Sequence, residues 1–307
     1  MEESKSLVRR WEDMEIDILV RIFKEFDVIE LTSGISRVCS SWRLACSDPL
    51  LWKTVDLGIL KSNFIQIPTL PYIWVDDRSN KKLTRVLKIA MGLSCGSVTC
   101  IIFHVNLYLK DDHLIHIAER CPRLKHLVLP AWDLITKGGI CEAIRKWEEL
   151  ESMTMPYICS PPYIMEVIGM NCKNFTQLKV MGCFNVLFAS SIAKYLPKLK
   201  VLSLRCSTLF MEALILILDC MEHLEVLNVA HCLFIEDLPP PASRRIIREL
   251  NEAIIEKAKA SRLRTFFYCH KESCVLCQRM VNDNGSMRWF KYEEGSWRND
   301  EVSSLAY

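Results

Sequence analysis

A short apolar pattern recurs at nearly constant spacing through the middle of the chain, and this spacing limits the possible folds more than any other feature. The pattern is L-x-x-L-x-L, in which other apolar residues replace Leu in several copies. Its regular copies begin at Val98, Leu124, Leu150, Phe175, Leu199 and Leu224. Neighbouring copies are therefore 24 to 26 residues apart, and two further copies begin at Trp52 and Leu263 after wider intervals. Such a period predicts a chain of stacked, similar units.

Each interval between copies also carries a helical pattern. In residues 112–124, apolar side chains recur at i, i+3 and i+7 on one helical face, and Pro122 prevents the helix from continuing. A similar apolar stripe over residues 246–254 predicts a helix in the wider final interval. One strand and one helix in about 25 residues cannot bury their own apolar faces, so the units must stack into a solenoid. This is leucine-rich-repeat geometry, and it predicts an α/β fold with about seven or eight short repeats.

Three short helices are predicted ahead of the repeats. Apolar residues between positions 19 and 26 fall at i, i+3, i+4 and i+7, which predicts a first amphipathic helix. Asp27 and Glu30 form a capping-box pattern that begins a second helix, and a third carries Val38 and Trp42. A core made by so few residues is too small to be stable alone, so we expect a partner protein to cover it.

These regions resemble known motifs. Residues 11–26, 38–43 and 48–52 are similar to the F-box, a three-helix motif, although the family usually has Leu-Pro where this chain has Met14-Glu15. Residues 117–129 resemble the cysteine-containing leucine-rich repeats of F-box proteins. The order of the two resemblances matches plant F-box/leucine-rich-repeat proteins.

The resemblance and the repeats together divide the chain into three regions. We expect an F-box at residues 7–52, a solenoid at 53–268 with an insertion at 58–80, and a capping segment at 269–307. Trp52 is expected to fill the hinge between the F-box and the first strand, which would fix the orientation of one module against the other.

The resemblance also implies a function. F-box proteins are substrate receptors of cullin-based SCF ubiquitin ligases, in which the F-box docks on a Skp-type adaptor and the repeats hold a protein substrate. It implies a non-catalytic subunit without a cofactor, located in the nucleus and/or cytoplasm. The residues expected to contact the adaptor are apolar: Ile18, Leu19, Ile22, Phe23, Val28, Leu31, Val38 and Trp42. The alternative for each of them is that it only fills the three-helix core.

The substrate surface is predicted on the concave face of the solenoid. His104, Lys179 and Arg205 fall on that face by strand alternation and are the candidate contacts, unless their side chains are merely solvated. The face is neither strongly charged nor strongly apolar, so it identifies no substrate. Two other functions remain open, a scaffold that assembles no ligase and a small-ligand-dependent receptor of the same ligase class.

Composition excludes several classes of protein. The chain has 39 Lys and Arg against 37 Asp and Glu, so we expect neither nucleic acid nor an anionic membrane as a partner. Its longest apolar run, residues 213–218, is far shorter than the roughly 20 residues of a membrane span, and the N-terminus lacks the apolar core of a signal peptide. We therefore expect an intracellular protein whose 15 cysteines are buried as small apolar residues and form no disulfides.

The last cluster of chemically reactive residues lies after the final repeat. Cys269, His270, Cys274 and Cys277 are residue types that bind zinc, and C-x-x-C is a common ligand spacing. Adjacent residues cannot easily reach one tetrahedral site, however, so Cys269 and His270 make a poor ligand pair. We expect no metal here, with zinc on Cys269, Cys274 and Cys277 as the alternative, and no catalytic cysteine, because no residue is placed to activate one.

Overall fold

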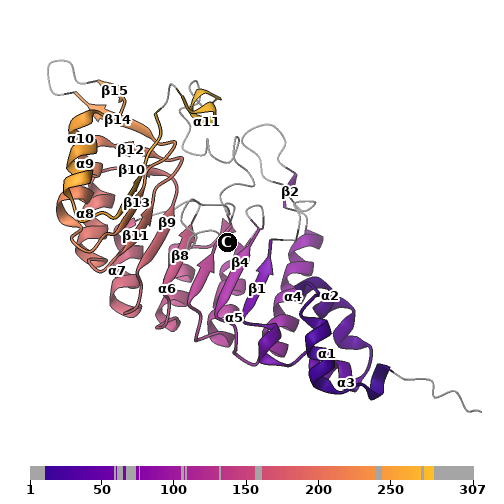
Figure 1. Ribbon diagram of the computed structural model, residues 1–307. Helices are drawn as coiled ribbons and strands as arrows, with labels where there is room; N and C mark the ends of the chain where they lie inside the picture. The colour runs from indigo at the N-terminus through magenta and orange to yellow at the C-terminus, as the bar shows by residue number, and fades with distance from the viewer. Residues whose placement is uncertain are drawn as a thin grey trace, which may run out of the picture.

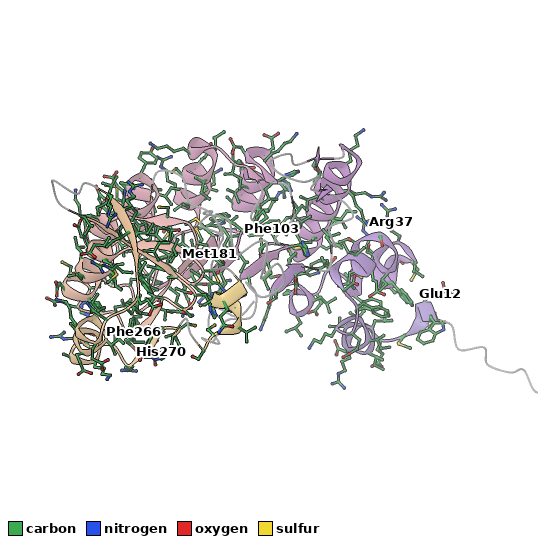
Figure 2. All side chains as sticks on the ribbon, turned by 90° about the horizontal axis from the view of Figure 1, so that it is seen from above. Glu12, Arg37, Phe103, Met181, Phe266 and His270 are labelled. Atoms are coloured by element: carbon green, nitrogen blue, oxygen red, sulfur yellow. The ribbon has the colours of Figure 1, made fainter. Side chains whose placement is uncertain are left out.

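The computed structural model describes residues 11–58, 60, 65–66, 74–75, 77–104, 107, 109–130, 133–155, 161–238, 244–270 and 273–279. The protein forms an elongated, curved stack of strands and helices with the N-terminal helices at one end (Figure 1). Glu12 and Arg37 lie at that end and Phe266 and His270 at the other (Figure 2). Parts of the predicted F-box (7–10), insertion and capping segment (280–307) lie outside the described residues.

The N-terminal unit contains the three predicted helices, α1 (Ile16–Phe23), α2 (Val28–Ser33) and α3 (Ser40–Ala45). The predicted capping box is confirmed, because the Asp27 carboxylate accepts hydrogen bonds from the backbone N–H groups of Ile29 and Glu30 at 2.8 Å. The Glu30 carboxylate in turn accepts from the Asp27 N–H at 3.0 Å. The predicted third helix is wrong in one respect, because Val38 lies before its first residue.

The repeat strands form one eight-stranded parallel sheet in the order β1-β4-β6-β8-β9-β11-β13-β16. Their bounds are β1 Thr54–Leu57, β4 Cys100–Phe103, β6 His126–Val128, β8 Ser152–Met155, β9 Gln177–Val180, β11 Val201–Ser203, β13 Val226–Asn228 and β16 Thr265–Phe267. The fourth residue of every L-x-x-L-x-L copy pairs with its counterpart in the next strand, from Val55 opposite Ile101 to Leu227 opposite Phe266. The predicted solenoid of seven or eight repeats is confirmed, with one strand per copy.

A layer of helices covers one face of this sheet (Figure 1). The helices are α4 Asp77–Ser94, α5 Asp111–Arg120, α6 Lys137–Lys146, α7 Pro161–Asn171, α8 Val186–Tyr195, α9 Met211–Cys220 and α10 Glu252–Ala260. A final short helix, α11, spans Val275–Arg279. None of the described helices has the length and apolar character that a membrane crossing requires.

Shorter strands pair outside the main sheet. β10 (Cys183–Phe184), β12 (Thr208–Phe210), β14 (Leu233–Asp237) and β15 (Arg245–Arg248) form a second sheet. Two further pairs join β5 (Leu109–Lys110) with β7 (Asp133–Leu134), and β2 (Ile65–Gln66) with β3 (Trp74–Val75). The pair β2–β3 and the first turn of α4 fall within the predicted insertion.

The predicted helix over residues 246–254 is wrong in its first half. Ile246 and Ile247 belong to strand β15, which pairs antiparallel with β14. The β-branched pair favours a strand, and Arg245 and Arg248 form ion pairs with acidic residues of β14. The helix α10 begins only after Asn251, whose side chain accepts a hydrogen bond from the Ile254 N–H at 3.0 Å and caps the helix.

The junction between the N-terminal helices and the sheet is tightly packed. Trp52 is 1% exposed, as expected for a residue that fills the hinge, and its indole N–H donates to the Cys46 carbonyl at 2.6 Å. The next residue, Lys53, already accepts hydrogen bonds from the first repeat, because its carbonyl bonds the N–H groups of Thr99 and Cys100. The helices α2 and α4 also pack together. The two modules therefore share one continuous hydrophobic core.

Candidate functional site

Four of the eight residues predicted to contact the adaptor are buried. Leu19, Phe23, Val28 and Leu31 form the core between the three N-terminal helices. For these four, the prediction of a direct adaptor contact is corrected, because the helices of this chain already cover their side chains. They stabilise the unit that presents the docking surface.

The other four remain accessible to different degrees. Ile18 and Val38 are exposed, with 45% and 59% of their surface open to solvent. Ile22 and Trp42 are partly buried and pack against the core from its edge. Among the predicted residues, Ile18 and Val38 are therefore those that a partner can reach without any movement of the chain.

The structure adds exposed apolar residues that the sequence interpretation missed. Trp11, Ile16, Phe26, Leu44 and Leu50 are all open to solvent. Apolar periodicity alone assigns all such residues to a core. The sign that some of them would be exposed was that residues 16–20 contain more apolar side chains than one helical face can bury. The sequence pattern did not show which of these apolar residues would be exposed.

These exposed side chains are concentrated in one part of the protein. Residues 11–50 hold seven of the thirteen large apolar side chains that are exposed in the described part of the chain. The remaining six are spread over the much longer solenoid and the segment that follows it. Single exposed apolar residues are normal on a protein surface, whereas a concentration of them marks an interaction site.

A row of aromatic contacts holds part of this surface in place. The Trp42 ring packs edge-on against Trp11 at 6.5 Å and against Phe23 at 5.2 Å, and Phe23 packs against Phe26 at 6.4 Å. The Trp42 indole N–H also donates to the Trp11 carbonyl at 3.3 Å. The exposed rings of Trp11 and Phe26 are therefore fixed by contacts with the core, which reduces the entropy lost when a partner covers them.

The candidate substrate contacts on the sheet differ from the prediction. His104 is half-buried just after strand β4, but Lys179 is fully buried and Arg205 nearly so. The prediction that these two cations present exposed charge to a substrate is therefore corrected. Strand alternation identified the face of the sheet on which each lies, but it carries no information on whether that face is covered.

Lys179 belongs to a buried polar row across the sheet. It lies opposite Thr154 in β8 and Ser203 in β11, and Ser203 lies opposite Asn228 in β13. All four side chains are buried. Buried polar groups need hydrogen-bond partners, and in this row the Asn228 side-chain oxygen accepts a hydrogen bond from the Ala230 N–H at 2.9 Å.

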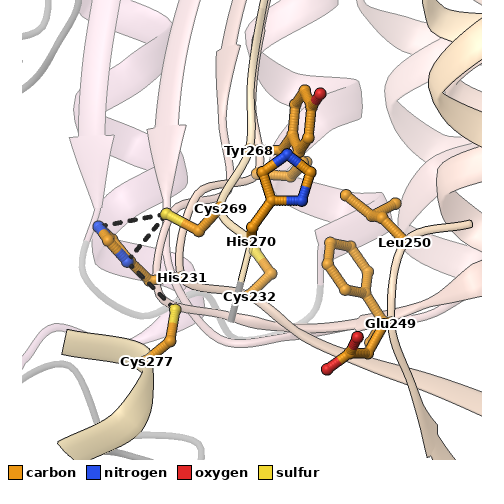
Figure 3. A pocket seen from close by; sticks show the side chains of 10 residues that line it. His231, Cys232, Glu249, Leu250, Tyr268, Cys269, His270 and Cys277 are labelled. Atoms are coloured by element: carbon orange, nitrogen blue, oxygen red, sulfur yellow. Dashed lines mark hydrogen bonds between the residues drawn. The ribbon is translucent and has the colours of Figure 1, made fainter. Parts of the chain in front are cut away.

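The three cysteines of the C-terminal cluster lie together, and the histidine beside them is not the expected one. The ligand atoms of Cys269, Cys274, Cys277 and His231 all lie within 4.8 Å of one another. His231 comes from the segment between β13 and β14, whereas His270 is turned toward Tyr268, with the two rings 5.2 Å apart (Figure 3). Within the part of the chain that is described, this is the one group of metal-binding residue types close enough to share an ion.

The thiols in this cluster affect one another. The pKa of Cys269 lies well below the usual range because the Cys277 thiol donates a hydrogen bond to it and because His231 lies beside it. The pKa of Cys277 is raised because that same hydrogen bond would be lost on ionisation. The shared hydrogen bond thus moves the pKa values of the two thiols in opposite directions.

Four cysteines buried elsewhere in the protein have the properties of inert core residues. Burial raises the pKa of Cys46 to about 11 and the pKa of Cys121 and Cys172 to about 12. Burial, followed by the nearby Asp56 carboxylate, raises the pKa of Cys100 to about 11. These thiols stay protonated at neutral pH, which makes them poor nucleophiles and weak metal ligands.

Comparisons with known proteins agree with this architecture. A family model described as F-box-like matches residues 16–58. An F-box/LRR-repeat protein of Arabidopsis thaliana is 54% identical over 99% of this chain and 98% of its own length. A putative F-box protein from the same plant is 27% identical over 100% of this chain and 99% of its own length, and the F-box protein SKIP19 is 27% identical over 80% and 78%. This chain therefore belongs to the plant F-box/leucine-rich-repeat protein family.

Proposed function

We propose that this protein is the substrate-recognition subunit of an SCF-type cullin ubiquitin ligase. Its N-terminal helices would dock on a Skp-type adaptor, and through it on a cullin scaffold, while the solenoid holds a protein substrate for ubiquitination. In this role the chain needs no catalytic residue, because the conjugating machinery supplies the chemistry. Its expected location is the nucleus and/or the cytoplasm, where such complexes work.

The observation that carries the proposal is the concentration of exposed apolar side chains in residues 11–50, on the three N-terminal helices and the segments that flank them. Ile18 and Val38 together expose apolar surface that would be covered in a complex. Interfaces draw most of their binding free energy from a few such anchors near the centre of the contact. A small helical unit that is apolar on the outside as well as the inside is typical of a surface that binds another protein.

The packed junction supports a mechanism based on proximity. A receptor promotes ubiquitination by holding substrate lysines close to the charged conjugating enzyme. The increase in rate is larger when the connection between the docking helices and the solenoid allows only a narrow range of lysine–enzyme distances. Trp52 is buried and hydrogen-bonded at the boundary, and α2 packs on α4. These contacts restrict the angle between the docking helices and the solenoid, which keeps the effective concentration of the substrate high.

The substrate surface is proposed to lie on the face of the sheet opposite the helices, on the accessible residues near its edges. His104 remains a candidate contact because it is half-buried at the end of a strand. Lys179 and Arg205 would act only indirectly, by maintaining the shape of this face, since both are buried.

Capture of a purified Skp-type adaptor by the full-length chain tests the docking step. The double variant Ile18→Asp with Val38→Asp places two charges on the proposed surface without touching the core. If each anchor contributes about 1.5 kcal/mol, the two together should weaken binding roughly 100-fold. The matched control is Met170→Asp on α7, which is 69% exposed but lies in the solenoid and should leave binding unchanged.

The result also separates the alternatives. A correctly folded double variant that still binds the adaptor at full strength would show that the docking surface lies elsewhere. A wild-type chain that binds no Skp-type adaptor at micromolar concentration would favour the scaffold that assembles no ligase. Adaptor binding together with substrate capture that depends on an added small molecule would favour the ligand-dependent receptor.

A further inference from the structure

We propose that His231, Cys269, Cys274 and Cys277 form a structural zinc site that fastens the segment after the last repeat strand to the solenoid. The four residues come from two parts of the chain: His231 lies between β13 and β14, Cys269 and Cys274 lie between β16 and α11, and Cys277 lies in α11. Three thiolates and one imidazole form one of the common ligand sets of structural zinc. Soft sulfur ligands favour zinc over magnesium, calcium or manganese.

The distances within the cluster match the shape of a tetrahedral zinc site. The His231 Nδ1 atom lies 3.2 Å from the Cys269 sulfur, 3.4 Å from the Cys274 sulfur and 3.5 Å from the Cys277 sulfur. Zn–S bonds of about 2.3 Å and Zn–N bonds of about 2.0 to 2.1 Å, set at the tetrahedral angle, put nitrogen and sulfur about 3.5 Å apart. The three nitrogen–sulfur distances therefore lie within about 0.3 Å of the tetrahedral value, and all four ligand atoms lie within 4.8 Å of one another.

Hydrogen bonding alone does not explain this arrangement. One imidazole nitrogen carries either a single proton or a single lone pair, so it makes one good hydrogen bond. Here three sulfur atoms surround the same nitrogen of His231 (Figure 3 shows the contacts of Cys269 and Cys277). A cation at the centre accounts for all three contacts at once, because each thiolate and the ring nitrogen then bind the ion and no longer compete for one proton.

The local backbone supplies the spacing that a metal site needs. Cys274 and Cys277 are separated by two residues at the start of α11, and the Gln278 N–H donates to the Cys274 carbonyl at 3.0 Å, so that one helical turn holds both sulfur atoms on one side. The Cys274 N–H donates to the carbonyl of His270, the residue after Cys269, at 3.1 Å, which holds Cys274 close to Cys269. His231 has a left-handed backbone conformation with φ of 60°, which is unfavourable for a residue with a side chain and has to be stabilised by its surroundings.

The described contacts of the short helix α11 bury little apolar surface. Among the described side chains of residues 273–278, Cys277 is the buried one, whereas Val275 is 62% exposed. A helix of five residues is not stable on its own, and one buried thiol removes too little apolar surface from water to dock it. Zinc ligation would supply the missing free energy, as it does in small domains that fold only with their metal.

The site would also close the end of the solenoid. Strand β16 is the last strand of the main sheet, and its three residues are only half-buried. Terminal repeats need a cap because no further unit covers them. The ion would join the segment after β13 to the segment after β16, across 38 to 46 residues of sequence, and thereby tie the last two strands together. The adjoining cavity of about 30 Å³ holds a few waters at most, so this region is not an organic-ligand site.

Metal analysis of the full-length chain tests the proposal. We expect one zinc ion per chain after purification under reducing conditions with added zinc sulfate, and one cobalt ion after exchange, with the visible absorption of tetrahedral cobalt thiolate. His231→Asn and Cys274→Ser should each weaken zinc binding at least 100-fold, measured by competition with a chromophoric chelator. The matched controls are His270→Asn, which changes the neighbouring histidine, and Cys220→Ser, which changes an exposed cysteine, and both should keep one equivalent of zinc.

Each outcome decides the question. Loss of zinc in the two ligand variants, with full zinc in both controls and unchanged circular dichroism of the solenoid, supports the site. A wild-type chain that takes up no zinc with micromolar or tighter affinity overturns the proposal, whatever the variants do. Full zinc binding in the combined His231→Asn and Cys274→Ser variant would also overturn it, because the ion would then lie elsewhere. Hydrogen exchange gives a second measurement, since removing zinc should increase exchange in residues 273–279 while the strands stay protected.

Discussion

Replacement of Trp52 should reveal how strongly the docking helices and the solenoid depend on each other. Trp52 is 1% exposed and donates a hydrogen bond from its indole N–H to the Cys46 carbonyl at 2.6 Å. A buried Trp removes about 150 to 250 Å² from water, which at about 25 cal/mol per Å² corresponds to roughly 4 to 6 kcal/mol. Partial collapse of the cavity recovers some of this, so Trp52→Ala should lower the free energy of unfolding by about 4 kcal/mol.

Two further variants separate packing from hydrogen bonding. Trp52→Phe keeps most of the apolar volume but removes the indole N–H, so it should lower the free energy of unfolding by about 1 to 3 kcal/mol. Leu50→Ala changes an exposed residue two positions away and should stay within about 0.5 kcal/mol of the wild type. Urea unfolding followed by circular dichroism measures all three differences on the same scale.

Hydrogen exchange tests the shared core directly. If Trp52 joins the two modules, Trp52→Ala should lower protection in α1 and α3 and in β1 together, because these elements open as one unit. The reasoning would be refuted if Trp52→Ala unfolded within about 1 kcal/mol of the wild type. It would also be refuted if protection fell in the helices while β1 was unchanged, since the modules would then be independent.

Two other predictions concern the solenoid. Gly169→Ala should destabilise the protein by more than about 2 kcal/mol, because a Cβ atom there would clash with the Tyr195 carbonyl oxygen where α7 meets α8. Gly92→Ala, at an open position in α4, should instead stabilise the protein by about 0.5 to 1 kcal/mol. Equal urea midpoints for the two variants would contradict this prediction. Burial lowers the pKa of His113, and the Lys110 N–H donates to its Nδ1 atom, a bond that the protonated ring cannot accept. The His113 ring therefore binds a proton more readily in the unfolded chain than in the folded one, so the free energy of unfolding should fall as the pH drops below about 6.5. His113→Asn should reduce the change of this free energy with pH by up to about 1.4 kcal/mol per pH unit. An unchanged pH dependence would show that His113 is not responsible.

The repeat pattern predicted the main sheet almost completely. The register of eight strands follows from one apolar position per copy, such as Leu127 and Leu178, because a shift of one residue would turn each strand's apolar side chains away from the helices. The pattern failed over residues 246–254, where apolar residues at helical spacing continue from a strand into a helix. Such a stripe fits a strand over its first part and a helix over the rest. The antiparallel pairing with β14 and the ion pairs across it favour the strand, and these contacts lie outside the stripe itself.

The candidate sites were less predictable because they depend on coverage by distant segments. Periodicity showed that Leu19 and Ile18 both lie on an apolar helix, but only the packing of α1 against α3 decides that the first is buried and the second exposed. Lys179 was placed on the correct face of the sheet, and its burial has no signal in its own neighbourhood. Strand alternation shows to which face of the sheet a side chain points, whereas the solvent exposure of that side chain depends on the whole fold.

The C-terminal cluster shows most clearly why local sequence misleads. Judged from residues 269–277 alone, zinc was disfavoured because Cys269 and His270 are adjacent and cannot easily share a tetrahedral site. Stacking of the repeats removes that obstacle, because it brings the segment that follows one strand beside the segment that follows the next, and so places His231 against Cys269 across 38 residues of sequence. In a solenoid, a ligand one repeat earlier is as close in space as a neighbour in the chain. Metal sites in such folds should therefore be sought among residues that follow adjacent strands of the sheet, because a search for closely spaced motifs here finds three of the four ligands and misses His231.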